Sequence, residues 1–308
     1  MALLEVKDVD FRYYGSSFEL KGVNLSLNNV DKLVIYGREN AGKTTLLRVL
    51  CGLENYVRGS ILLEGIELKE LSHKDMDVGF SFDRRILDGK AIAGEIISMP
   101  MKLREVPPKD IDNYLEEMAK KCNLPMQAQV KDLSDMQVAM LILARLFSVD
   151  RRLYLVDDVW KDLPEEEKSI VEDFLIEIVK DKSVIVASDD EKLAKRVTTG
   201  KILVLTDREV APMLSLDEIS SRPINMQSAI LAGYELHIGE LIKESDNYFA
   251  IIGAEQYLVA KPICDIYVGK RVCFAIKRLG ELSDKDEVGD GEVMSFYYDV
   301  DVERIITA

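Results

Sequence analysis

The sequence predicts an α/β fold followed by a small all-β domain, and three observations support this. The apolar run Leu33 to Tyr36 leads into a glycine-bearing turn and then into a helical apolar pattern: Leu46, Leu47, Leu50 and Leu53. Further along, two apolar strand-like runs, 151–158 and 182–190, flank a helical stretch, which is the βαβ pattern of a parallel sheet. After residue 246, apolar and polar residues alternate with a period of two, as in β-strands that bury one face.

These patterns divide the chain into two domains. We expect a nucleotide-binding domain over 1–218, with a helical subdomain at about 84–150, and a β-barrel-like accessory domain over 219–308. The stretch "SSRPIN" suggests a linker, and Phe296, Tyr298, Val300 and Val302 are expected to share one face of a strand. The first strands are predicted at 3–6, 23–27, 32–36 and 60–68.

Composition excludes several classes of function. The 308 residues include 40 basic and 55 acidic side chains, for a net charge of -15, which argues against nucleic acid as a partner. No apolar run reaches the roughly 20 residues that cross a bilayer, and the N-terminus lacks the features of a signal peptide. We therefore expect no direct membrane insertion. The four cysteines show no C-x-x-C spacing, so free thiols in a reducing cytoplasm are expected.

A phosphate-binding loop is the strongest single signal. The stretch from Gly37 to Thr44, GRENAGKT, fits G-x-x-x-x-G-K-[ST] and lies between a strand and a helix, a context that disfavours a chance match. In such a loop, backbone N–H groups surround the β-phosphate, Lys43 bridges the β- and γ-phosphates, and the hydroxyl of Thr44 holds Mg²⁺. The candidate nucleotide-binding residues of this loop are Gly37, Asn40, Ala41, Gly42, Lys43, Thr44 and Thr45.

The order of parts over residues 1–215 resembles the nucleotide-binding subunit of ABC transporters. In "FRYYGSSFELKGVNLSL" the resemblance implies that Tyr13 stacks on adenine, with Tyr14 the next match. "LYLVDD" is similar to the Walker B strand, which implies that Asp157 binds Mg²⁺ through water. "LSDMQ" is similar to the LSGGQ signature that faces the nucleotide of a second subunit. Its residues here are Leu133, Ser134, Asp135, Met136 and Gln137.

Several positions depart from the family pattern. The family's catalytic glutamate after the Walker B aspartate is Asp158, its switch histidine is Ser188, and its glutamine at the end of "VGFSF" is Asp83. Shortening the glutamate withdraws its carboxylate by roughly 1 Å, a misplacement that can lower a rate on the order of 10²-fold. Both signature glycines are replaced as well, by Asp135 and Met136. We therefore predict a chain that binds ATP and Mg²⁺ but hydrolyses ATP weakly or not at all.

The resemblance also implies partners and a location. These are an integral membrane transporter subunit and a second ATP-binding subunit, in a homodimer or a heterodimer, with the chain peripheral on the cytoplasmic face of the inner membrane. Two alternatives stay open at this point. One is an active transport ATPase with relocated catalytic groups, and the other is a soluble ABC-type regulatory protein without a channel. The transported substrate and its direction are not encoded in this chain.

Overall fold

The computed structural model describes residues 2–16, 18–72, 75–81, 83–206, 210–221, 226–245, 247–258, 268–269, 271–278, 291–299 and 304–307. The chain divides into two compact units, Met1–Met213 and Leu214–Ala308. The boundary expected after residue 218 falls inside helix α7 (Leu216–Ser221). Most of the linker expected after it lies outside the described residues.

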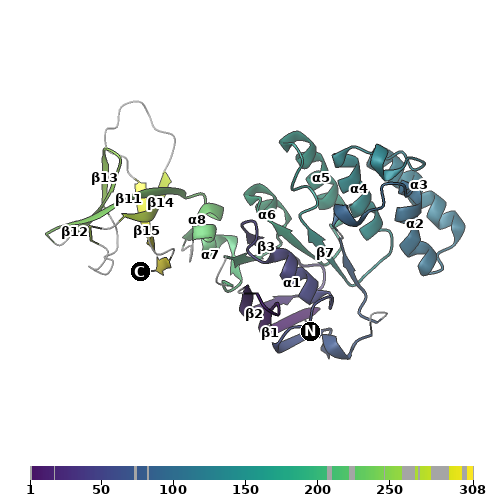
Figure 1. Cartoon of the computed structure of the whole chain (residues 1–308), viewed down its shortest axis with the longest axis horizontal. Coiled ribbons are helices and arrows are strands. Elements are labelled where there is room, and N and C mark those ends of the chain that lie inside the picture. The colour runs from purple at the N-terminus through teal and green to yellow at the C-terminus, as the bar shows by residue number, and fades with distance from the viewer. Residues whose placement is uncertain are drawn as a thin grey trace. The chain divides into compact units, whose positions relative to one another are not determined.

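A parallel sheet forms the centre of the first unit, which confirms the predicted α/β class (Figure 1). Five of its strands run in the order β9-β3-β8-β7-β6, and every neighbouring pair among them is parallel. Strands β7 and β8 are buried almost throughout, as their continuous apolar sequences require. The bounds are β3 (Lys32–Gly37), β6 (Val78–Phe80), β7 (Leu153–Asp157), β8 (Val184–Ser188) and β9 (Lys201–Leu205).

A second, antiparallel sheet in the same unit has the order β2-β1-β4-β5. Its strands are β1 (Leu4–Arg12), β2 (Glu19–Leu27), β4 (Arg58–Leu63) and β5 (Ile66–Glu67). The single strand expected over 60–68 is in fact two strands, because Glu64 and Gly65 adopt positive φ angles of 50° and 82° and turn the chain. One apolar core contains residues of both sheets and of helix α1, so this core supports the loop that precedes α1.

Helices α1 to α5 of the first unit follow the predicted pattern, whereas α6 was not predicted. Helices α2 to α4 lie in the region expected to be helical, and α2 packs against both α3 and α4 (Figure 1). The bounds are α1 (Lys43–Leu50), α2 (Ala93–Leu103), α3 (Pro108–Lys121), α4 (Asp135–Leu146), α5 (Glu165–Ile178) and α6 (Glu191–Val197). The described residues also form the short 3₁₀ helices η1 (Leu68–Glu70), η2 (Arg84–Ile86) and η3 (Val130–Asp132). No described helix is long and apolar enough to cross a bilayer.

The second unit is built around an antiparallel sheet of order β13-β12-β11-β14-β15-β16, as the period-two alternation predicts. Its elements are β10 (Leu214–Ser215), α7, α8 (Met226–Leu231), β11 (Glu235–Glu244), β12 (Asn247–Ile252), β13 (Glu255–Leu258), β14 (Arg271–Arg278), β15 (Gly291–Asp299) and β16 (Arg304–Thr307). Leu241, Tyr248, Ala250, Val272 and Phe274 form its core. Closure of this sheet into a barrel stays a prediction.

Some sequence predictions concern side chains outside the described part. The face expected to be shared by Phe296, Tyr298, Val300 and Val302 is one, and the thiols of Cys264 and Cys273 are another. Cys51 and Cys122 are described, and both are free and buried, as the spacing predicts.

Candidate functional site

The loop between β3 and α1 requires glycine at two places. A Cβ on Gly37 would lie 2.6 Å from the carbonyl oxygen of Leu205, and a Cβ on Gly42 would lie 2.6 Å from the ring of Phe18. Gly42 also adopts a φ of 99°, and Asn40 a φ of 63°, a region that asparagine tolerates better than most side chains. The local sequence therefore fixes a tight loop whose backbone lies close to its surroundings.

Lys43 is the buried cation of this loop. Its side chain is only 8% exposed, and its Nζ donates hydrogen bonds to the carbonyls of Gly37 at 2.7 Å and Arg38 at 2.9 Å. Burial lowers the pKa of Lys43, while nearby carboxylates, Asp158 first among them, oppose that shift. The ammonium group is thus held over the loop, where it can donate hydrogen bonds to phosphate oxygens in place of the two backbone carbonyls.

The first turn of α1 offers backbone donors to an anion. The N–H groups at the start of an α-helix have no intrahelical partners, and among the described residues no side chain caps this helix. The helix dipole adds a partial positive charge at the same end. The backbone N–H groups of Lys43, Thr44 and Thr45 can therefore donate hydrogen bonds to phosphate oxygens.

Thr44 and Asp157 come together although 113 residues separate them. The hydroxyl of Thr44 donates to Oδ1 of Asp157 at 3.0 Å, and the backbone N–H of Asp157 donates to the hydroxyl of Ser81 at 2.8 Å. Burial raises the pKa of Asp157, and the hydrogen bond from Thr44 partly counteracts this. A hydroxyl and a carboxylate beside a phosphate cradle fit Mg²⁺, which prefers oxygen ligands and keeps several of its waters. The donor set therefore suits this ion.

Asp158 occupies an unusual environment. Its backbone φ is 40°, and among the described residues its Oδ1 is buried without a hydrogen-bond partner. Burial, assisted by the negative charge of Asp189, raises the pKa of Asp158 to about 7. The carboxyl group is therefore about half protonated near neutral pH, and only the ionised fraction can accept a proton from water.

Ser188 ends strand β8 and is completely buried. Its hydroxyl accepts a hydrogen bond from the backbone N–H of Asp190 at 3.0 Å. Asp190 in turn caps α6 by accepting from the N–H of Leu193 at 2.9 Å, and it forms an ion pair with Lys168 of α5. The serine thus belongs to the packing of this turn.

Asp83 begins the 3₁₀ helix η2. Its carboxylate accepts from the backbone N–H of Arg85 at 2.9 Å and from the guanidinium of the same residue. These hydrogen bonds from Arg85 lower the pKa of Asp83. The carboxylate is therefore ionised and engaged locally.

The signature-like stretch starts helix α4. Ser134 and Gln137 form a capping box, in which the Ser134 hydroxyl accepts from the N–H of Gln137 at 3.2 Å and the Gln137 side chain accepts in return at 3.0 Å. Leu133 closes η3 immediately before, and Met136 lies in the first turn of α4.

Arg84 is a residue that sequence reasoning missed. Its guanidinium forms an ion pair with Asp135, 51 positions away, so a cation neutralises the carboxylate that replaces a signature glycine. The arginine follows Asp83 directly, but nothing in the local pattern shows that it reaches the start of α4.

The two candidate tyrosines differ in exposure. Tyr13 packs edge-on against Phe11 with ring centroids 4.8 Å apart, also contacts Phe18, and its hydroxyl lies 3.4 Å from that of Thr45. Tyr14 is fully exposed. Tyr13 is thus joined to the loop residues, and Tyr14 has both ring faces free for stacking.

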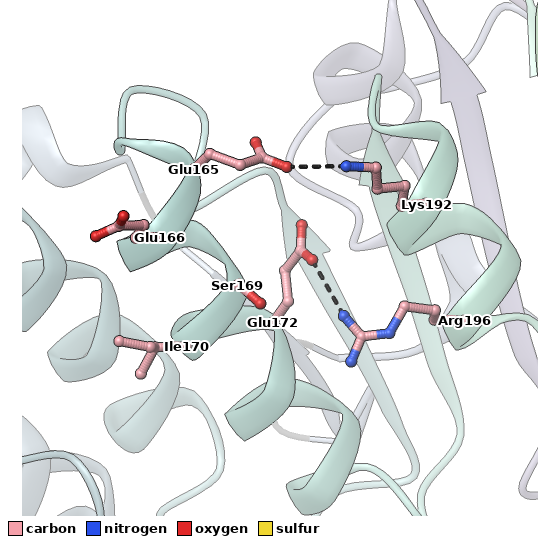
Figure 2. Close-up of a pocket in the computed structure, with 7 residues that line it drawn as sticks. All are labelled: Glu165, Glu166, Ser169, Ile170, Glu172, Lys192 and Arg196. Carbon is pink, nitrogen blue, oxygen red and sulfur yellow. Dashed lines mark hydrogen bonds and ion pairs between the residues drawn. The ribbon is translucent and has the colours of Figure 1, made fainter.

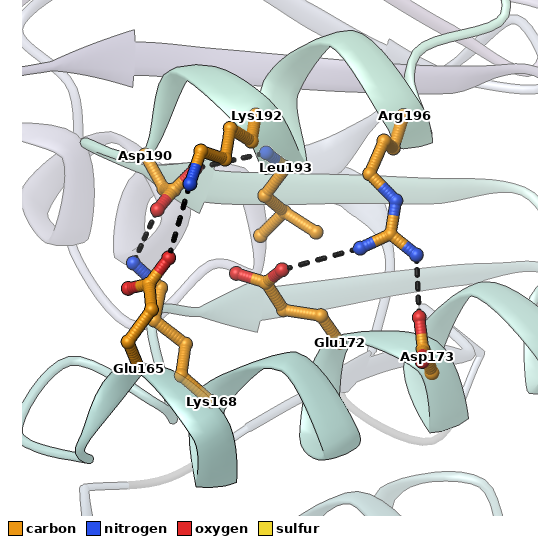
Figure 3. A network of polar contacts seen from close by, with 8 residues as sticks. All are labelled: Glu165, Lys168, Glu172, Asp173, Asp190, Lys192, Leu193 and Arg196. Atoms are coloured by element: carbon orange, nitrogen blue, oxygen red, sulfur yellow. Dashed lines mark hydrogen bonds and ion pairs between the residues drawn. The ribbon is translucent and has the colours of Figure 1, made fainter.

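A surface pocket of about 500 Å³ lies elsewhere, between α5 and α6, and none of the predicted site residues line it (Figure 2). Two ion pairs cross from α5 to α6 at its edges, Glu165 with Lys192 at 3.3 Å and Glu172 with Arg196 at 3.5 Å. Figure 3 shows that the Asp190 and Lys168 pair belongs to the same contact between the helices. The Lys168–Asp190 pair ties α5 to the turn that follows Ser188.

A second unpredicted ion pair lies at the loop itself. Nζ of Lys161, in the turn after β7, lies 2.5 Å from Oε1 of Glu39, although 122 residues separate the two. The side chain of Lys161 is 42% exposed and that of Glu39 is 63% exposed. The candidate phosphate loop is thus tied to the turn that follows Asp157 and Asp158 at the end of β7.

Comparison with known proteins identifies the family. The ABC transporter family matches residues 20–161. The lipoprotein-releasing system ATP-binding protein LolD of Buchnera aphidicola is 30% identical over 203 residues, which cover 62% of this chain and 86% of LolD. The chain belongs to the ABC transporter ATP-binding family. It is also similar to the methionine import ATP-binding protein MetN of Clostridium tetani, at 28% identity over 76% of each chain.

Solved structures agree on the fold of this ABC cassette. The dimeric, post-hydrolysis structure of the ATP-binding cassette MJ0796 bound to ADP and Pi matches with a TM-score of 0.61 at 20% identity, over 69% of this chain and 98% of that one. The family resemblance drawn from the motifs is therefore confirmed, whereas the roles of individual residues stay predictions.

Proposed function

We propose that this ABC cassette binds Mg-ATP and hydrolyses it slowly or not at all, acting through closure of a dimer on a membrane partner. The observation that carries the proposal is an asymmetry within one site. The phosphate loop, Lys43 and the Thr44–Asp157 pair have the arrangement that nucleotide binding needs. The positions that would activate water instead hold Asp158 and the buried Ser188.

Binding rests on this chain's own groups. The amides of the first turn of α1 and Lys43 would hold the phosphates, and Thr44 with Asp157 would hold Mg²⁺, which neutralises phosphate charge when bound. A tyrosine at position 13 or 14 would stack on adenine.

Hydrolysis would be slow for two physical reasons. The side chain of Asp158 is one methylene shorter than glutamate, which withdraws its carboxylate by roughly 1 Å from the place where a water would be activated. Ser188 is completely buried and carries no charge, so it offers the transition state little electrostatic stabilisation.

The partners follow from the family. LolD and MetN are, by name, the ATP-binding proteins of a releasing system and of an import system, and the MJ0796 cassette is dimeric. We infer an integral membrane subunit and a second ATP-binding subunit, identical or different, at the cytoplasmic face of the inner membrane. Binding energy alone can favour a closed dimer if that state has the higher ATP affinity.

The test measures binding and turnover separately. We expect the purified chain to bind a nonhydrolysable ATP analogue with Mg²⁺, and the Lys43→Ala variant to lose this binding. We expect phosphate release far below about 1 s⁻¹, the lower end of ordinary enzyme turnover. Asp158→Glu, alone and combined with Ser188→His, should raise the rate of phosphate release, and adding Lys43→Ala should abolish this gain.

Two outcomes would refute the proposal. A wild-type turnover above about 1 s⁻¹ would favour an active ATPase with relocated catalytic groups. Failure to recover any integral membrane protein when the chain is purified from its native membrane extract would favour a soluble regulatory protein.

A further inference from the structure

The Glu39–Lys161 ion pair joins the candidate phosphate loop to the turn after β7. Glu39 is the only acidic residue between Gly37 and Thr45. It lies two positions after the glycine whose carbonyl accepts from Lys43. An uncompensated carboxylate here would repel phosphate, and ATP more than ADP, because ATP carries one more phosphate group.

Lys161 supplies the compensating charge. Its Nζ contacts the Glu39 carboxylate at 2.5 Å, and its positive charge is near enough to Lys43 to lower the pKa of that buried lysine. The hydrogen bond to Glu39 raises the pKa of Lys161, and the negative charge of Asp158 adds to this rise. Lys161 therefore lies within electrostatic range of both the phosphate loop and the aspartate of the hydrolytic position.

The side chain of Lys161 is also free to change partner. It is 42% exposed, and an ion pair between exposed side chains is worth about 1 kcal/mol or less, so a stronger anion can replace Glu39. A terminal phosphate is such an anion, and a charge-assisted contact to it is stronger than one to a screened carboxylate. Ser188, at the position where the family has a histidine, provides no cation.

We propose that Lys161 distinguishes ATP from ADP in this cassette, by leaving Glu39 and contacting the terminal phosphate of bound ATP. This rests on the proposed Mg-ATP binding and deepens it, because it assigns the γ-phosphate contact to a residue outside the recognised motifs. When no triphosphate is bound, the ion pair with Glu39 keeps Lys161 beside the loop. Lys161 is thereby a specificity-determining residue for the nucleotide.

The test is a double-mutant cycle on nucleotide affinity, measured by calorimetry with AMP-PNP and with ADP at fixed Mg²⁺ and low salt. We expect Lys161→Met to weaken AMP-PNP binding about tenfold and ADP binding less than twofold. Glu39→Gln should strengthen AMP-PNP binding about threefold, because it removes the repulsion and releases the lysine. The matched control is Lys121→Met, since Lys121 is 44% exposed and pairs with Glu117 at 3.0 Å on α3, away from the loop.

The decisive comparison is made in the Glu39→Gln background. If Lys161 contacts the phosphate, Lys161→Met still costs AMP-PNP affinity there. If the lysine only neutralises Glu39, the second substitution costs nothing, and the proposal is overturned. Equal losses for AMP-PNP and ADP would overturn it too.

Failure of the proposed function looks different in the same assay. If the wild type binds neither nucleotide, the binding part of the proposed function fails. Rapid turnover by the wild type removes the claim of weak hydrolysis and leaves the Lys161 comparison intact, because AMP-PNP is not cleaved. Circular dichroism and thermal melting of each variant establish that the fold is retained.

Discussion

Replacing Asp158 by asparagine should change how the stability of the nucleotide-free protein depends on pH. The ordinary pKa of an aspartate, 3.8, rises to about 7 at Asp158 because the carboxyl group is buried. Between these values the folded state binds more protons than the unfolded state. The free energy of unfolding therefore falls as the pH rises from about 4 to about 7. Asparagine has nearly the same shape and does not titrate, so this loss should disappear.

The size of the effect follows from the shift. A change of about three pKa units, at 1.36 kcal/mol each, sets an upper limit of about 4 kcal/mol. The side chain is partly exposed although its Oδ1 is buried, and water around it reduces this value. We expect Asp158→Asn to stabilise the protein by about 2 kcal/mol more at pH 8 than at pH 5.

Trp160 provides the assay. It is the only tryptophan in the chain, it is completely buried, and it lies two residues after Asp158. Its fluorescence during urea denaturation reports unfolding of the first unit, without the contribution of the second. Asp162→Asn serves as the control at an exposed position of the same turn and should leave the pH dependence of the wild type unchanged. If the difference between Asp158→Asn and wild type is the same at pH 5 and pH 8, the raised pKa is wrong.

Two further substitutions test the packing around the site by the same denaturation assay. Gly42→Ala should destabilise the protein by about 2 kcal/mol, since the new Cβ would lie 2.6 Å from the Phe18 ring and φ is 99°. Gly15→Ala is the control, because Gly15 has a φ of 75° but open space around the position of a Cβ, so it reports backbone strain alone. If Gly15→Ala and Gly42→Ala destabilise the protein equally, the contact with Phe18 contributes nothing. Arg196→Met should cost about 1–2 kcal/mol at pH 8 and less at pH 5. The substitution removes the ion pair of the buried Glu172, whose pKa is raised by burial, so the cost is larger where Glu172 is ionised. A loss of stability that is the same at pH 5 and pH 8 would contradict this explanation.

The elements that the sequence predicts well are those with a local signal. The phosphate loop is recognisable because a strand, two glycines, a lysine and a helix follow one another within about twenty residues. Continuous apolar runs similarly predict the buried strands β7 and β8. The run over 60–68 was predicted less well, because the turn at Glu64 and Gly65 interrupts an otherwise apolar stretch without changing its character.

The contacts that sequence analysis missed join exposed side chains far apart in the chain. Glu39 and Lys161 are 122 residues apart, and Arg84 and Asp135 are 51 apart. Such pairs carry no periodicity, and charged residues are common on any surface. In both pairs a basic residue compensates an acidic one that lies within a candidate nucleotide-binding motif. Only the fold shows that Glu39 and Asp135 are not isolated negative charges.

The same reasoning applies to Ser188 and limits how activity can be restored. Its side chain is completely buried, and Asp190, whose N–H donates to its hydroxyl, is held by the start of α6 and by Lys168. A histidine at this position needs space that the turn does not provide, so Ser188→His must move the α6 turn before an imidazole can reach a phosphate. Asp158→Glu adds one methylene where the chain already carries a carboxylate. We therefore expect most of any recovered turnover to come from position 158, and the added histidine to contribute only where Lys168 no longer holds Asp190.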